Sequence, residues 1–210
     1  MNKEKGTFIS FEGIDGSGKS TQIKRLYKTL VSHNSDVILI REPGGTKIGE
    51  QIRSVLLERE NAGMTPVTEL LLYEAARAQI VSEVIVPALS EGKIVICDRF
   101  FDSTLAYQGY ARGLSIESVD FLNHLSTGGI EPDVTFLLDI DPLLAAQRMS
   151  NRQSSNDRLE DEGQTFMKKV RDGYIDMSRK YDRIFIIDAS ASVDRVSVQI
   201  EQKVWEVLRK

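Results

Sequence analysis

Short apolar runs alternate with longer amphipathic stretches along this chain. The short runs are rich in β-branched and aromatic residues and have the length of buried strands: Thr7–Glu12, Val37–Arg41, Ile94–Asp98, Val134–Asp139 and Ile184–Asp188. The longer stretches space their apolar residues as helices do, over residues 19–33, 47–59, 66–91, 115–126, 142–152, 163–180 and 193–209. Because parallel strands need crossover connections, this pattern predicts a three-layer α/β fold in which helices flank a five-stranded, mostly parallel sheet.

The chain shows no internal boundary. No linker, repeat or low-complexity tract divides residues 1–210, so we expect a single domain. The stretch Ser150–Glu162 is the exception to the apolar pattern, since it is polar and has almost nothing to bury. We therefore expect a mobile segment there.

Composition and charge exclude several classes of protein. The 27 Lys and Arg residues against 31 Asp and Glu residues give a net charge of −4, so we expect no nucleic-acid partner. The single cysteine, Cys97, cannot form an internal disulfide, and two histidines disfavour a zinc site. The first apolar run ends at Glu12, too short for a membrane span of about 20 residues. We expect a cytoplasmic protein with no membrane partner.

A phosphate-binding motif directly follows the first predicted strand. Residues 13–20 match GxxxxGK[ST], and a helical pattern begins at Thr21. The glycines allow backbone N–H groups to point at phosphate oxygens, with the positive end of the helix dipole behind them. We predict that nucleotide phosphates bind at Gly13, Ile14, Asp15, Gly16, Ser17, Gly18, Lys19, Ser20 and Thr21, with Lys19 on the terminal phosphates and Ser20 on Mg²⁺. The alternative is a glycine-rich turn that binds no ligand.

Charged residues follow two further strands, at the edge where open α/β sheets bind ligands. Arg41 and Arg99 suit an acceptor phosphate and the group in transfer, because a planar guanidinium can hold two phosphate oxygens. Asp98 ends its strand where a carboxylate can hold Mg²⁺ directly or through water. Exposed ion pairs with Glu42 or Asp102 are the alternative for the arginines, and a turn or helix cap is the alternative for Asp98.

These motifs together resemble the thymidylate kinases. The resemblance rests on residues 11–13 (Phe-Glu-Gly), 41–45 (Arg-Glu-Pro-Gly-Gly), 73–77 (Tyr-Glu-Ala-Ala-Arg), 98–104 (Asp-Arg-Phe-Phe-Asp-Ser-Thr) and 106–109 (Ala-Tyr-Gln-Gly), in the expected order. It implies a P-loop nucleoside monophosphate kinase-like fold and transfer of the γ-phosphoryl group of MgATP to dTMP, which gives dTDP and ADP. Members of the family are usually homodimers packed through helices, and the apolar stretch 66–91 is a candidate for that contact.

The resemblance also assigns substrate-binding residues. It implies three contacts with the base: Tyr73 stacks on thymine, Arg77 reads a base carbonyl and Gln108 pairs with the base edge. It also implies that Thr104 lies near the base, Tyr107 close to the deoxyribose and Arg53 near the substrate. Asp15 is implied to contact the sugar hydroxyl and to help to arrange magnesium and phosphates. From the residues alone, Tyr73 also fits a core aromatic, and Arg53 fits a solvated helix charge.

A lid at about residues 148–162 is implied by the same resemblance. Bacterial-type members carry the catalytic arginine in the lid and lack one in the phosphate loop, and this loop has none. Arg158 matches the lid arginine best, Arg152 is a second candidate, and Arg148 lies one helical turn before Arg152, on the ATP side. Such arginines stabilise charge on the transferring group and help to exclude water. The alternative is a solvated surface loop.

Two other functions remain open from the sequence. A deoxynucleoside kinase would phosphorylate a 5′-hydroxyl and would need a carboxylate base near that atom. A regulator that binds ATP and transfers nothing would show no turnover with any acceptor. The choice between thymidine and dTMP as acceptor separates the two kinases.

We expect Arg158→Ala to lower kcat and to leave dTMP affinity nearly unchanged, because a lid arginine acts mainly in the transition state. The measurement is kcat and KM for dTMP at saturating ATP, with Arg152→Ala compared alongside. A large loss of dTMP binding with normal turnover would contradict the lid assignment.

Overall fold

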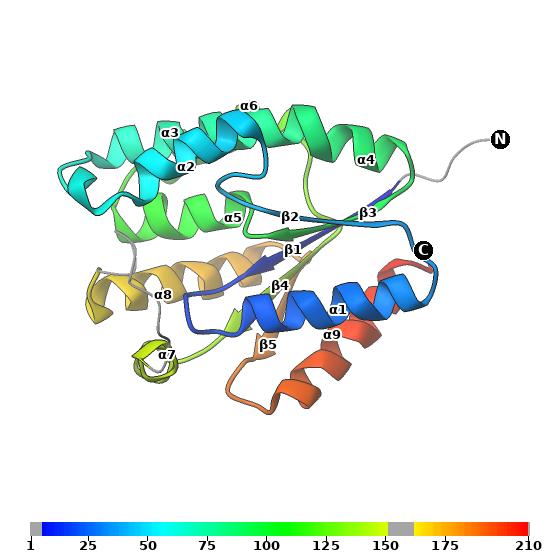
Figure 1. Ribbon diagram of the computed structural model, residues 1–210. Coiled ribbons are helices and arrows are strands. Elements are labelled where there is room, and N and C mark those ends of the chain that lie inside the picture. The colour runs from blue at the N-terminus through cyan, green and yellow to red at the C-terminus, as the bar shows by residue number, and fades with distance from the viewer. Residues whose placement is uncertain (1–5, 151–161, 210) are drawn as a thin grey trace.

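A five-stranded parallel sheet lies at the centre of the molecule (Figure 1). The computed structural model describes residues 6–150 and 162–209. The strands are β1 (Thr7–Glu12), β2 (Val37–Arg41), β3 (Ile94–Asp98), β4 (Val134–Asp139) and β5 (Ile184–Asp188), in the order β2-β3-β1-β4-β5. Every neighbouring pair is parallel. The predicted strands and the predicted α/β class are confirmed.

Helices connect the strands, as parallel pairing requires. Those described are α1 (Lys19–Ser32), α2 (Lys47–Leu57), α3 (Pro66–Ile80), α4 (Val86–Ser90), α5 (Phe101–Thr104), α6 (Ile116–Thr127), α7 (Pro142–Ser150), α8 (Gln164–Lys180) and α9 (Val193–Val207). The hydroxyls of Thr46, Thr65, Ser115 and Ser192 each accept a backbone N–H at the start of a helix. These N-caps explain why α2, α3, α6 and α9 begin where they do.

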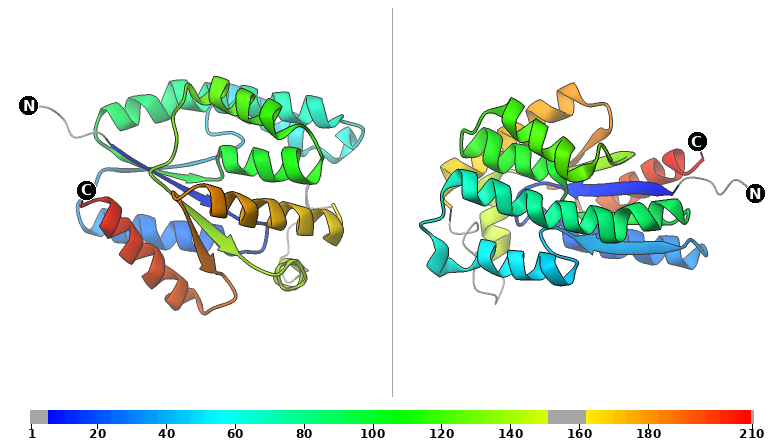
Figure 2. Two further views of the ribbon diagram at one scale, coloured as in Figure 1. Left: turned by 180° about the vertical axis from the view of Figure 1, so that it is seen from behind. Right: turned by 90° about the horizontal axis from the view of Figure 1, so that it is seen from above.

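The helices form the two outer layers of the fold. Helices α1 and α9 pack together on one face of the sheet, while α3, α4 and α8 lie over the other face (Figures 1 and 2). Alternate strand residues enter separate buried clusters: Phe8 packs with Ile80 and Ile85, whereas Ile9 belongs to the cluster of Leu26 and Leu30. The two faces of β1 are therefore both covered, and its apolar run is continuous for that reason.

The structure differs from the sequence prediction after β3. No helix is predicted there, yet α5 continues into a π-helical segment, Leu105–Ala111, which lies beside α8 (Figure 2). Most side chains of this stretch are buried, so it lacks the polar stripe by which an amphipathic helix is recognised. The predicted helix over 66–91 is α3 and α4 joined by a π-helical segment, Val81–Ile85. No helix in the described part of the chain is long and apolar enough to cross a membrane.

Candidate active site

The phosphate loop lies between the end of β1 and the start of α1, and its shape depends on glycine. Gly13 and Gly16 have φ angles of 132° and 83°, which L side chains rarely adopt. A Cβ atom would lie 2.6 Å from the carbonyl oxygen of Leu138 at Gly13, and 2.5 Å from that of Ala145 at Gly16. The sheet and α7 therefore press against the loop, and only glycine fits at these two positions.

Lys19 curls back over this loop. Its ammonium group donates to the carbonyl oxygens of Gly13 (2.8 Å) and Ile14 (3.2 Å) and lies 3.7 Å from the Asp15 carboxylate. Burial has the largest effect in lowering the pKa of Lys19, and the positive charge of Arg99 has the second largest. An anion bound in the loop would favour the charged ammonium form, since opposite charges at short range stabilise each other.

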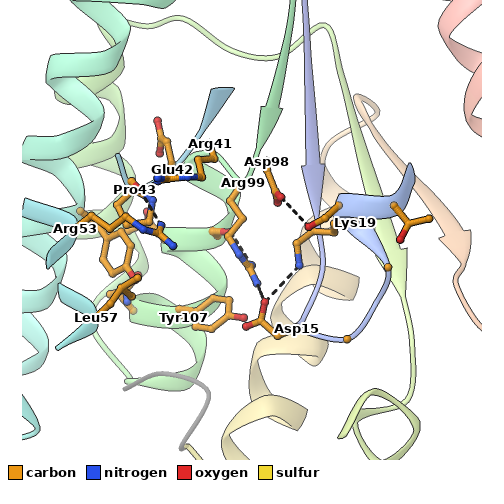
Figure 3. A pocket seen from close by; sticks show the side chains of 18 residues that line it. Asp15, Lys19, Arg41, Glu42, Pro43, Arg53, Leu57, Asp98, Arg99 and Tyr107 are labelled. Atoms are coloured by element: carbon orange, nitrogen blue, oxygen red, sulfur yellow. Dashed lines mark hydrogen bonds and ion pairs between the residues drawn. The ribbon is translucent and has the colours of Figure 1, made fainter. Parts of the chain in front are cut away.

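Asp15 and Arg99 meet across the site, as Figure 3 shows. The Arg99 guanidinium donates to Asp15 at 2.7 Å, and it lies over the Tyr107 ring, 5.2 Å from its centroid. Arg99 does not pair with Asp102, the partner considered from sequence, because Asp102 forms a 2.6 Å ion pair with Arg183. Two residues predicted to act on phosphate are thus in contact although 84 positions separate them.

The backbone at Arg99 is unusual for a residue with a side chain. Its φ angle is 70°, in the left-handed region. The Arg99 N–H donates to the Phe11 carbonyl (3.0 Å), and the Cys97 thiol donates to the Arg99 carbonyl (2.9 Å). These bonds hold the turn after β3 in the conformation that directs the guanidinium at the phosphate loop.

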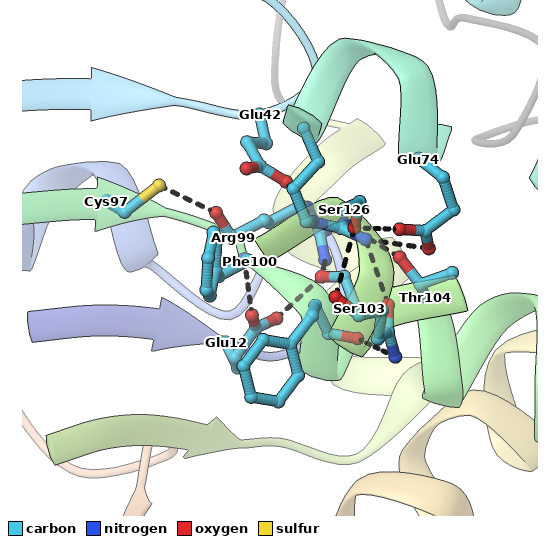
Figure 4. A network of polar contacts seen from close by, with 12 residues as sticks. Glu12, Glu42, Glu74, Cys97, Arg99, Phe100, Ser103, Thr104 and Ser126 are labelled. Atoms are coloured by element: carbon cyan, nitrogen blue, oxygen red, sulfur yellow. Dashed lines mark hydrogen bonds and ion pairs between the residues drawn. The ribbon is translucent and has the colours of Figure 1, made fainter. Parts of the chain in front are cut away.

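Glu12 is a site residue to which the sequence analysis gave no role. Its buried carboxylate accepts from the Phe100 N–H (2.7 Å) and the Ser103 hydroxyl (2.6 Å), as Figure 4 shows. It also accepts from the Tyr174 hydroxyl (2.7 Å). Burial, together with the neighbouring Asp102 carboxylate, raises the pKa of Glu12 to about 7. The sequence did contain a signal for Glu12, since a charged residue there ends an apolar strand beside the phosphate loop. It contained no such signal for Tyr174, which lies in no motif.

Ser20 and Asp98 offer oxygen atoms suited to magnesium. The Ser20 hydroxyl donates to the Asp98 carboxylate at 3.4 Å, and both residues line the same cavity. Within the described residues no group of three or more His, Cys, Asp or Glu side chains forms a metal cluster. The side-chain oxygens of Ser20 and Asp98 match in number the one or two protein ligands that magnesium commonly takes, with water and substrate phosphates completing its shell.

That cavity has a volume of about 220 Å³ and extends from the phosphate loop to the ends of β2 and β3. Arg41 and Arg53 both reach it and both donate to the carbonyl oxygen of Pro43, at 3.1 and 2.9 Å. Arg41 also pairs with Glu50 at 3.0 Å, instead of with Glu42 as considered from sequence. Arg53 lines the cavity, and its contact with the substrate stays a prediction. The two guanidinium groups make this end of the cavity positive.

The cavity also has aromatic and polar walls. Tyr73, Thr104, Tyr107 and Gln108 all line it, which brings together four residues predicted to contact the acceptor nucleotide. Tyr73 is half-buried at the cavity wall. The Tyr107 hydroxyl is buried with no hydrogen-bond partner among the described residues, and burial raises its pKa, so it stays neutral. A buried hydroxyl without a partner beside a cavity suits a ligand that supplies one.

Arg77 lies behind this wall and not on it. Its guanidinium is 1% exposed and donates to Glu42 (2.9 Å), Glu74 (2.8 Å) and the Thr104 hydroxyl (2.7 Å). A further bond from the Arg77 guanidinium reaches the Asn123 side chain at 3.0 Å. Direct contact between Arg77 and a base therefore stays a prediction; in the structure Arg77 holds Thr104, which does line the cavity.

The predicted lid is described only at its start. Arg148, on α7, donates to the Ala189 carbonyl at 3.0 Å and so reaches the loop after β5. Arg152 and Arg158 lie outside the described residues, as does most of the predicted mobile stretch.

Comparisons with known proteins agree with one another. The family model described as Thymidylate kinase matches residues 11–200. The thymidylate kinase of Thermoanaerobacter sp. (strain X514) is 51% identical over 93% of this chain and 96% of its own length. That of Caldanaerobacter subterraneus subsp. tengcongensis is 48% identical over 98% of each chain. The crystal structure of thymidylate kinase from Ehrlichia chaffeensis covers 96% of this chain with 99% of its own, at 36% identity and a TM-score of 0.77.

We expect Glu12→Gln to change the pH dependence of stability. The pKa of Glu12 in the folded protein, about 7, exceeds the value of about 4.3 for an exposed Glu, so this group stabilises the folded state at low pH and the contribution is lost as pH rises through 7. Wild type should therefore lose a few kcal/mol of unfolding free energy relative to the variant between about pH 5 and pH 8.

Urea unfolding of both proteins across this range is the measurement. Glu42→Gln is a second test of the same argument, because burial also raises the pKa of Glu42 to about 7, so this variant should differ from wild type in the same direction. Parallel stability curves for wild type and Glu12→Gln would contradict the assignment.

Proposed function

The chain belongs to the thymidylate kinase family, and on this premise we propose how its residues transfer the γ-phosphoryl group of ATP to dTMP. Family membership makes it an enzyme that phosphorylates dTMP and forms dTDP. One observation carries the assignment of residues: a single cavity joins the phosphate loop to the wall formed by Tyr73, Thr104 and Gln108. A donor triphosphate and an acceptor nucleotide can therefore meet inside it.

The donor phosphates bind at the phosphate loop. The backbone N–H groups of Gly16 and Gly18 and the ammonium group of Lys19 supply positive charge there, and the start of α1 adds its helix dipole. Lys19 exchanges its contacts with loop carbonyls for phosphate oxygens when the nucleotide enters. Arg148 lies on the adenine side, at the loop after β5.

Transfer requires positioning and charge neutralisation more than proton removal. The acceptor is itself a phosphate, which is a nucleophile at neutral pH, so no general base is needed. Arg99 lies between the two ends of the cavity and can neutralise the group in transfer. Its ion pair with Asp15 holds the guanidinium in place while the acceptor sugar approaches the same carboxylate. Arg152 and Arg158 remain the lid arginines predicted from sequence.

Magnesium would be held by Ser20 and Asp98. These hard oxygen donors lie beside the loop, and the bound ion would neutralise charge on the donor phosphates. The chain's own contribution is the orientation of the two oxygens, which the hydrogen bond between them maintains.

The acceptor occupies the other end of the cavity. Arg41 and Arg53 are both tied to Pro43, and their guanidinium groups can hold the dTMP phosphate. The Tyr73 ring supplies a flat wall for thymine, Gln108 faces the base edge, and Tyr107 lies near the sugar. A deoxynucleoside kinase would have little use for paired arginines here, so the geometry favours a monophosphate acceptor.

Release of ADP by the purified protein tests the proposal. With MgATP, we expect turnover of about 1–100 per second with dTMP and much slower turnover with dUMP, dCMP, AMP, thymidine or no acceptor. Lys19→Met, which removes the charge and keeps the length, should lower kcat at least about 100-fold with an unchanged melting temperature. Turnover with thymidine would instead support a nucleoside kinase, and silence with every acceptor would support a regulator that only binds ATP.

A homodimer is part of the proposal, together with a cytoplasmic location. Helices α3 and α6 pack side by side and carry exposed apolar side chains: Val67 (54% exposed), Leu71 (50%), Phe121 (68%) and Leu125 (68%). An exposed apolar face of this kind is typical of an interface between chains. The proposed dimer contact therefore involves α6 as well as the predicted stretch 66–91.

We expect Phe121→Asp to weaken the dimer at least about tenfold in dissociation constant, because an aromatic side chain near the centre of an interface carries much of its energy. Sedimentation velocity over a range of protein concentrations measures the effect. Val198→Asp is the matched control, because Val198 is 53% exposed on α9, away from this face. Equal effects of the two substitutions, or a monomeric wild type, would contradict the assignment.

A further inference from the structure

A buried carboxylate that no motif contains holds the Gln108 side chain. Glu69, on α3, is 1% exposed, and its Oε1 accepts a hydrogen bond from the Gln108 amide nitrogen Nε2 at 2.7 Å. Gln108 is itself 1% exposed and lines the cavity. The one hydrogen bond that the Gln108 side chain forms within the described residues is this bond to Glu69, so Glu69 decides which way the amide faces.

Arg112 pairs with the Glu69 carboxylate, so that this group accepts hydrogen bonds and does not donate them. The Arg112 guanidinium donates to both oxygens of Glu69, through Nε to Oε1 and through Nη2 to Oε2, each at 3.2 Å. A fork of this kind favours the ionised carboxylate, which accepts hydrogen bonds and donates none. The Gln108 NH₂ group must therefore point at Glu69, because the opposite orientation would place the amide oxygen against a negative charge.

The fixed amide presents one pattern to a bound base. With one N–H directed at Glu69, the carbonyl oxygen and the second N–H of Gln108 remain for the ligand. Thymine and uracil present an N–H donor at N3 beside a carbonyl acceptor at C4. Cytosine presents the reverse order on the same edge, an acceptor at N3 beside an amino donor at C4. A free amide could turn over to suit cytosine, whereas an amide fixed by Glu69 cannot.

We propose that Glu69 is a specificity-determining positioning residue: it locks the Gln108 amide so that the site accepts pyrimidines with an N3–H and rejects cytosine. The inference rests on the proposed function, since it requires the acceptor base to lie against Gln108. Glu69 acts through Gln108 and does not contact the reacting atoms. Leaving a buried polar group mismatched is the physical basis of such discrimination.

Glu69→Gln tests the lock. This substitution keeps the size of the side chain and adds a donor, so the Gln108 amide gains a second orientation. We expect the ratio of kcat/KM for dTMP to that for dCMP to fall at least about tenfold. The ratio of dTMP to dUMP should not change, because those two bases share the same edge and differ only at C5.

Two control variants separate positioning from structural support. Glu162→Gln alters the other partner of Arg112, at 2.6 Å, without touching Gln108, so it should leave the dTMP to dCMP ratio at the wild-type value. In a Gln108→Ala background, Glu69→Gln should cause no further change in that ratio. Equal losses with dTMP and dCMP in Glu69→Gln, or a further change in the Gln108→Ala background, would overturn the inference.

A measurement on the wild type covers the case in which Glu69→Gln fails to fold. The Gln108 side-chain NH₂ signals, identified by their absence in Gln108→Ala, should exchange slowly with solvent in the ligand-free protein. Fast exchange, typical of a freely rotating amide, would overturn the lock. Failure of the wild type to phosphorylate dTMP would overturn the proposed function itself, and is seen before any variant is compared.

Discussion

The candidate active site depends on one buried carboxylate, that of Glu12 at the end of β1. Its three hydrogen bonds reach Phe100 and Ser103 in the segment after β3, and Tyr174 on α8, residues 88, 91 and 162 positions away. The carboxylate thus joins the strand that leads into the phosphate loop to the turn that presents Arg99 and to a helix on the sheet face. Burying such a group is costly unless its oxygens are bonded, so the three donors and the carboxylate require one another.

This junction explains the position of Arg99. The left-handed backbone at this residue costs about 1–3 kcal/mol, and the bonds from Phe100 to Glu12 and from Arg99 to Phe11 hold it there. Arg99 also donates to the hydroxyls of Ser103 (3.2 Å) and Tyr174 (3.4 Å). These bonds fix the direction of the guanidinium within the protein itself, and pre-organised charge of this kind is what the proposed role of Arg99 requires.

Charges in the cavity are paired in ways that ligands can exchange. Lys19 and Arg99 share Asp15, and Arg41 is paired with Glu50. Elsewhere, Arg77 is buried against Glu42 and Glu74, and Arg112 pairs with Glu69 and Glu162. Arg77 bonds to Thr104, and Arg112 pairs with Glu69, which accepts a hydrogen bond from Gln108. Arg77 and Arg112 thus support two residues of the cavity wall, one directly and one through a carboxylate.

The sequence by itself determined the sheet, the phosphate loop and the chemistry of the strand ends, because apolar periodicity, glycine spacing and polar residues after strands are local signals. It failed at Phe101–Ala111, where burial on all sides erases the amphipathic pattern. Tertiary structure alone decided that Arg77 lies behind Thr104 and that Arg99 pairs with Asp15. It also decided that Glu69 accepts from Gln108 and that Tyr174 donates to Glu12. Each of these is a contact between side chains distant in sequence, and its partner is chosen only when the layers pack.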